Sequence, residues 1–170
     1  MQEHRALILR SNRFLGSALV DRGLVSVNDL ELANEKFMEA VQSSELKRAS
    51  ILSTLLFETK ALEEKALIEH LVEEEGIGLI DLSHIELRSL RPFNLDIALC
   101  WASSTIPFDK IENTYMLATC YRLSAPVIKY WEEFFDGRVI WYGTSTTSMS
   151  RALERLEEIH ETEDAAAAEE

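Results

Sequence analysis

The chain is poor in the residues that build disulfide and metal sites, with two cysteines and four histidines among 170 residues. Cys100 and Cys120 stand in apolar surroundings and form no CxxC motif, so we expect two buried free thiols rather than a disulfide. No pair of histidines has the HxxxH or HExxH spacing typical of zinc ligands. We therefore expect no metal site.

Basic residues are also scarce: 17 lysines and arginines face 30 aspartates and glutamates, and the net charge is −13. Nucleic-acid binding needs a basic stripe that displaces counterions from phosphates, and the longest run of basic residues is Lys47–Arg48. The charge also disfavours anionic membrane surfaces. The sequence therefore argues against nucleic acid as a partner.

Long hydrophobic runs are missing, because no apolar segment approaches the roughly 20 residues that span a bilayer. The first residues lack the pattern of a signal peptide. We expect a cytoplasmic protein without direct membrane insertion. Met1 and the acidic ending favour a complete chain, although a fragment that ends at a linker would look alike.

Catalytic motifs are missing as well, since the chain has no GxxxxGK[ST] phosphate loop. Asp81, His84 and Glu86 cluster at a predicted strand end and could form an acid/base group. No neighbouring serine or cysteine is marked as a nucleophile, and turn-forming polar residues explain the cluster more simply. We expect no catalytic residues, no cofactor and no enzymatic activity.

An internal repeat is the strongest positive signal in the sequence. Residues 15–38 and 52–75 share an apolar frame without a gap. The aligned pairs are Leu15 with Leu52, Leu19 with Leu56, Val20 with Phe57, Val25 with Leu62 and Leu30 with Leu67. Both glycines of the first copy are replaced in the second, by Ser53 and Lys60. The second copy therefore keeps the apolar residues that pack and loses the role of the two glycines.

The periodicity divides the chain into a helical subdomain (1–75), an α/β subdomain (76–160) and an acidic flexible tail (161–170). Expected helices run from a capping box at 26–29 to about 42, from about Ala49, from about Glu63 to Gly76, over 94–99 and 125–135, and from about Thr146. Expected strands are 79–82, 106–108 at a sheet edge, 114–119 and 138–142. These elements predict an α+β fold with a three- to four-stranded sheet packed with helices.

These motifs together resemble the N-terminal domain of bacterial type II secretion and type IV pilus assembly ATPases (the GspE N-terminal domain), including its MshEN form. The family's repeated motif begins Arg-Leu-Gly and continues through two aliphatics and a second glycine, and residues 15–30 match it well. In the second half, GIGLIDL, IPF, YMLAT and SMSRALERL follow the family's first strand, its Val-Pro-Leu, its central strand and its closing helix. The resemblance covers residues 10–158 and lacks the ATPase domain.

The resemblance implies that, in MshEN domains, the arginines and the glycine-bearing turns of this motif bind cyclic di-GMP. Here Phe14 and Ile51 occupy the two arginine positions, so a bidentate guanidinium contact is lost. The residual ligand-binding candidates are Arg13, Gly16, Arg22 and Gly23. We therefore do not expect cyclic di-GMP to bind.

The resemblance favours a non-catalytic interaction or regulatory module of a secretion or pilus system. Its partner would be a protein of the inner-membrane platform or the assembly ATPase. Aromatic anchors dominate interface energetics, and the candidate partner-binding residues are Trp131, Phe134, Phe135, Trp141 and Tyr142. The alternative function is a cyclic di-GMP sensor with a degenerate motif.

Overall fold

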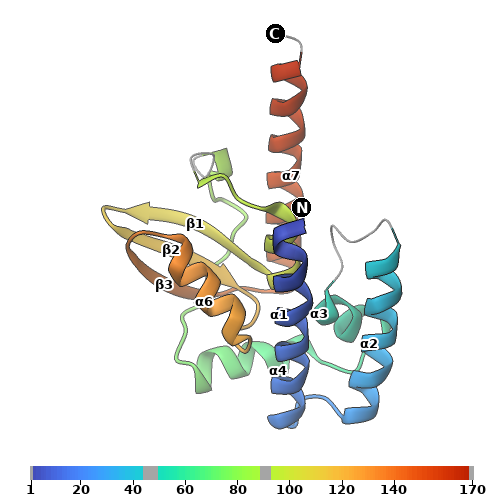
Figure 1. Cartoon of the computed structure of the whole chain (residues 1–170). Helices are drawn as coiled ribbons and strands as arrows, with labels where there is room; N and C mark the ends of the chain where they lie inside the picture. Colours follow the sequence, from blue (N-terminus) through green and yellow to red (C-terminus); the bar gives the residue numbers. More distant parts are fainter. Residues whose placement is uncertain (1, 44–49, 89–92, 169–170) are drawn as a thin grey trace.

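A computed structural model describes residues 2–43, 50–88 and 93–168 and has an α+β fold (Figure 1). The helices are α1 (Gln2–Asp21), α2 (Val27–Gln42), α3 (Ile51–Ser53), α4 (Glu64–Glu69), α5 (Ile97–Ser103), α6 (Ala125–Phe134) and α7 (Thr146–Ala168). Two π-helical turns, η2 (Thr54–Glu58) and η3 (His70–Glu74), continue α3 and α4. The strands are β1 (Thr105–Ile111), β2 (Thr114–Thr119) and β3 (Arg138–Gly143). This architecture confirms the predicted fold class.

The two copies of the sequence repeat form two helix–turn–helix units, α1–α2 and α3/η2–α4/η3. Ser26 caps α2 as its pattern predicts, because its hydroxyl accepts the amide of Asp29 at 3.1 Å. The shared apolar frame is buried most completely at Leu15 and its partner Leu52. One residue of the frame is not buried, since Phe57 is 59% exposed. The predicted start of the second unit, Ala49, lies outside the described residues.

Both turns pass through the left-handed backbone region at the same position of the repeat. Gly23 has a φ of 70°, and Lys60, which aligns with it, has a φ of 53°. A lysine adopts this conformation only at a cost, since its Cβ crowds the backbone. The second copy therefore keeps the turn after losing the glycine.

The sheet has the order β1-β2-β3, with β1 antiparallel and β3 parallel to β2. Pro107 lies on the edge strand β1 beside a register shift, where the missing amide costs no central hydrogen bond. Helix α6 connects β2 to β3 and lies against the sheet (Figure 1). Phe135, the residue after α6, stacks on Tyr115 of β2 with ring centroids 4.3 Å apart.

Residues 79–82 were predicted as a strand, and the structure corrects this. Leu79 forms one isolated parallel bridge with Gly143 at the end of β3. The amide of Leu82 instead donates to the side-chain oxygen of Ser148 on α7, at 3.0 Å. The chain therefore leaves the sheet after a single bridge, and the described residues form a three-stranded sheet.

Two helix boundaries also differ from the predictions. The helix expected over 94–99 begins at Ile97, because Asn94 has a φ of 48° and Asp96 is the N-cap. Helix α7 continues to Ala168 and extends beyond the rest of the molecule (Figure 1), although a flexible tail was expected from residue 161. The run of alanines at 165–168 favours helix.

One hydrophobic core crosses the boundary between the predicted subdomains. It joins Leu15 and Leu55 of the helical half to Leu117 of the sheet, Trp131 of α6 and Leu153 of α7. Helix α1 packs against α5 and α6 as well as against α2 and α3. The two halves are therefore packed as one unit around α1.

Candidate interaction surface

The inner face of α1 is fixed to the body by buried polar contacts. Asn12 accepts the amide of Ile51, the first residue of α3, at 2.9 Å. Ser124, which precedes α6, donates its hydroxyl to the carbonyl of Ser11 at 3.0 Å. Asn12 and Ser11 are at most 1% exposed. These bonds hold α1 in one rotation about its axis.

The N-terminal end of α1 is held by a third contact, between His4 and Asp96. Asp96 also accepts the amide of Leu99 at 3.1 Å as the N-cap of α5. Burial by itself would raise the pKa of Asp96, but the hydrogen bonds from His4 and from the Leu99 amide outweigh it and lower the pKa. The carboxylate therefore joins the starts of α1 and α5 in its ionised form.

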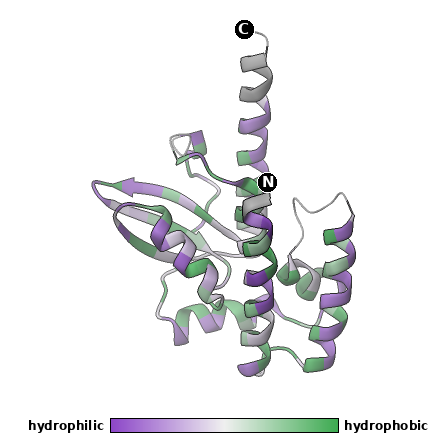
Figure 2. Cartoon of the chain, viewed as in Figure 1, coloured by the Kyte–Doolittle hydropathy of each residue, from purple (hydrophilic) through white to green (hydrophobic). Residues whose placement is uncertain are grey.

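Helix α1 carries three exposed arginines, Arg5, Arg10 and Arg13. At about 100° per residue Arg10 and Arg13 project on the side opposite the buried Ile8 and Leu15, whereas Arg5 projects beside the buried Asn12. No ion pair between described residues includes any of them. The guanidinium of Arg10 lies 5.7 Å from the ring centroid of Phe14. Hydrophilic residues recur along this helix in Figure 2.

An open groove of about 870 Å³ follows this outer face. Its polar lining includes Arg10, Arg13 and, at one end, Asp21. The remaining lining residues are Ala6, Leu9, Phe14, Ser17, Ala18 and Leu123. Phe14 is 43% exposed, so the groove offers an apolar floor beside two guanidinium groups that form no ion pair with described residues. We call Arg10, Arg13, Phe14 and this groove the arginine face.

The two glycines of the residual ligand motif have separate structural roles. Gly16 is buried, and a Cβ added there would lie 2.7 Å from Cδ1 of Leu30. It therefore allows α2 to approach α1, and Leu30 occupies the space that close approach of a ligand would need. Gly23 is exposed in the left-handed turn, with no atom within 4 Å of an added Cβ.

The two arginines of the residual motif lie in different surroundings. Arg13 lines the groove of the arginine face, whereas Arg22 lines a separate hollow of about 380 Å³. Glu69, Glu73 and Glu74 line the same hollow as Arg22. The four residual-motif candidates therefore do not meet in one site, and an anion at Arg22 would face three carboxylates.

The aromatic residues predicted to bind a partner divide into two groups. Trp131 and Phe135 are 1% and 6% exposed and belong to the core, which corrects their assignment to a surface. Phe134 is 37% exposed, and Trp141 and Tyr142 are half-buried. Sequence alone could not separate them, because aromatic residues serve cores and interfaces equally well.

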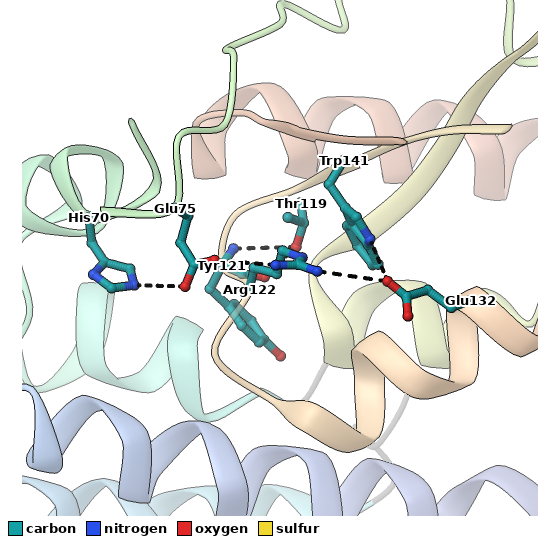
Figure 3. A network of polar contacts seen from close by, with 7 residues as sticks. All are labelled: His70, Glu75, Thr119, Tyr121, Arg122, Glu132 and Trp141. Carbon is teal, nitrogen blue, oxygen red and sulfur yellow. Dashed lines mark hydrogen bonds and ion pairs between the residues drawn. The ribbon is translucent and has the colours of Figure 1, made fainter. Parts of the chain in front are cut away.

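Trp141 takes part in a polar network that joins the two halves of the chain (Figure 3). Arg122, in the loop between β2 and α6, donates to Glu75 at 3.3 Å and lies 3.7 Å from Glu132. The indole of Trp141 donates to the same Glu132 oxygen at 3.3 Å, and buried His70 lies 3.6 Å from Glu75. The network ties the end of η3 to α6 and β3, and we assign it a structural role.

Asp81 of the acid/base cluster and the two thiols lie in ordinary structural surroundings. Asp81 is exposed and accepts from Ser83, and this hydrogen bond lowers the pKa of its carboxyl. Both thiols, Cys100 and Cys120, are free and fully buried, and burial raises the pKa of each well above its ordinary value. A buried protonated thiol is a poor nucleophile. Among the described residues, no group of three acidic, histidine or cysteine side chains could hold a metal ion.

No protein-family model and no curated protein matches the chain. Solved structures do: two crystal forms of the N-terminal domain of XpsE match with a TM-score of 0.51, at 15% and 14% identity. The matches cover 82% and 85% of this chain and 91% and 94% of the XpsE chains. This chain has the fold of the XpsE N-terminal domain.

A structure of MshE with cdg is also similar, at 19% identity over 84% of this chain and 97% of that chain, with a TM-score of 0.49. The XpsE matches confirm, for the fold, the resemblance to the N-terminal domains of secretion and pilus ATPases. In the described part of the chain, no helix is both long and apolar enough to cross a membrane.

Runs of consecutive basic residues do not predict the arginine face, because Arg10 and Arg13 are spaced along a helix whose other side is buried. The usable signal is their position relative to Ile8 and Leu15, which a helical projection puts on the opposite face.

Proposed function

We propose that this chain is a non-catalytic interaction module of a bacterial type II secretion or type IV pilus system. It binds a cytoplasmic part of the inner-membrane platform or the assembly ATPase. The observation that carries the proposal is the similarity of fold to the XpsE N-terminal domain over most of both chains. The arginine face supports it, because Arg10 and Arg13 form no ion pair with described residues and lie on a rigid helix beside an exposed aromatic ring, which suits docking.

A binding experiment with purified proteins tests this function. The full chain is titrated in turn with the cytoplasmic domains of the platform proteins and with the assembly ATPase from the same genome. We expect one of them to bind with micromolar or tighter affinity, measured by calorimetry. If all of them fail to bind, at concentrations up to about 0.1 mM, the proposal is wrong.

The alternative, a cyclic di-GMP sensor, has weaker support. Arg13 and Arg22 lie in different hollows, and Leu30 fills the space at Gly16. We therefore expect no heat of binding when cyclic di-GMP is titrated into the protein. Micromolar binding that is abolished by Arg13→Ala would establish the sensor function instead.

A further inference from the structure

We infer that the arginine face binds an acidic amphipathic segment of a partner protein. This inference rests on the proposed interaction role and adds to it the surface and the chemistry of the partner. It is carried by three observations: the charge of the face, its rigidity and the apolar lining of its groove.

The charge of the face is opposite to that of the molecule. The chain has a net charge of −13, yet Arg10 and Arg13 lie exposed on one side of one helix. They form no ion pairs with other described residues, whereas Arg122 lies between two carboxylates. Two arginines without a carboxylate partner in the described part of the chain are available to carboxylates from outside it.

The face is also preorganised. The contacts of Asn12 with Ile51 and of Ser11 with Ser124 fix the rotation of α1, and the contact of His4 with Asp96 holds its start. A partner therefore binds without ordering this helix, which avoids an entropic cost of association.

The groove selects an amphipathic segment over a simple polyanion. Leu9, Phe14 and Leu123 line it together with Arg10 and Arg13, so apolar side chains are needed to fill it. Fields at the protein surface are screened over about 8 Å at physiological salt. A short acidic segment interacts mainly with the local arginines, whereas a nucleic acid or a lipid surface also meets the acidic remainder of the molecule.

Fluorescence anisotropy with the full chain tests the inference. The probe is a labelled amphipathic peptide with Leu on one face of a helix and Glu on the other. The comparison peptide carries Lys in place of Glu. We expect only the Glu peptide to bind, with an affinity that falls as salt rises. Arg10→Glu with Arg13→Glu should weaken it by about tenfold or more, because two favourable pairs become repulsive.

A matched charge reversal serves as control. Arg138→Glu with Arg151→Glu makes the same change in net charge at two exposed arginines on β3 and α7. We expect this variant to bind the Glu peptide about as well as the unmodified chain. Equal weakening in both double variants would show a net-charge effect and overturn the inference. Since all four side chains are exposed, thermal melts should confirm that both variants remain folded.

Other occupants give distinguishable results. The inference is overturned if the Glu peptide fails to bind and the arginine face instead mediates binding to phosphatidylserine vesicles, to single-stranded DNA or to a second copy of the chain. Repeating the platform binding with Arg10→Glu/Arg13→Glu separates the two proposals. No binding by the unmodified chain refutes the proposed function, whereas equal binding by both proteins refutes only the assignment to the arginine face.

Discussion

Lys60 provides a sharp test of the repeated turn, because it occupies a left-handed backbone position with a φ of 53°. This conformation costs a residue with a Cβ roughly 1–2 kcal/mol. Glycine avoids that cost but loses about 0.5–1 kcal/mol more conformational entropy on folding. Lys60 is exposed, so removing its side chain sacrifices no packing. We expect Lys60→Gly to stabilise the protein by about 0.5–1 kcal/mol.

The aligned position of the first copy gives the opposite perturbation. Gly23 has a φ of 70° and open space around an added Cβ, so backbone strain is the main effect of a substitution there. Gly23→Lys should therefore destabilise the protein by about the amount that Lys60→Gly stabilises it. Lys60→Ala removes the charge but keeps the Cβ, and it should leave the stability nearly unchanged.

Urea unfolding followed by circular dichroism measures all three variants. The expected result is a higher midpoint for Lys60→Gly and a lower one for Gly23→Lys, with an unchanged dependence on urea. The reasoning is refuted if Lys60→Gly is less stable than the unmodified protein. It is also refuted if Lys60→Ala stabilises as much as Lys60→Gly, since charge would then explain the gain.

Two further predictions concern the attachment of α1. Asn12→Ala leaves the buried amide of Ile51 without its acceptor and should reduce the free energy of unfolding by about 1–3 kcal/mol in urea melts. The exposed control Asn34→Ala should change it little, and equal losses would contradict the role of Asn12. Asp96→Asn should be less stable than the unmodified protein at neutral pH. Because the folded-state pKa of Asp96 is lowered, its contribution is present above the ordinary value of 3.8 and is lost as the pH falls through the folded value, so the two stabilities should converge there. If the difference in stability persists at a pH where the Asp96 carboxyl is protonated, the contact with His4 does not depend on the negative charge of Asp96.

Much of the local structure follows from short-range rules that the residues carry themselves. Ser26 caps α2, Pro126 lies in the first turn of α6, and Gly76 has the positive φ expected after a helix. Pro107 places β1 at the edge of the sheet. Each of these signals works through backbone geometry or a hydrogen bond within a few residues, so the sequence alone reveals it.

The candidate site was harder to predict, because burial depends on contacts between distant segments. Trp131 and Phe134 are three residues apart on one helix, yet one lies in the core and the other is 37% exposed. The four residual-motif residues are neighbours in the sequence, but Arg13 lies on α1 and Arg22 in the turn after it, and they line different hollows. The exposure of Arg10 and Arg13 likewise depends on the packing of the opposite side of α1 against the body.

The sequence by itself determined that residues 15–38 and 52–75 fold as two related helical units, since their apolar spacing specifies which sides are buried. Only the tertiary structure decided what the altered positions do. The close contact of Leu30 explains why position 16 is a glycine. The left-handed turn is kept at Lys60 because packing elsewhere in the unit outweighs the strain of one residue. Packing of α1 between the two halves likewise leaves Arg10 and Arg13 on the outside, because the helical spacing separates them from Ile8 and Leu15 but only the tertiary contacts decide which side is covered.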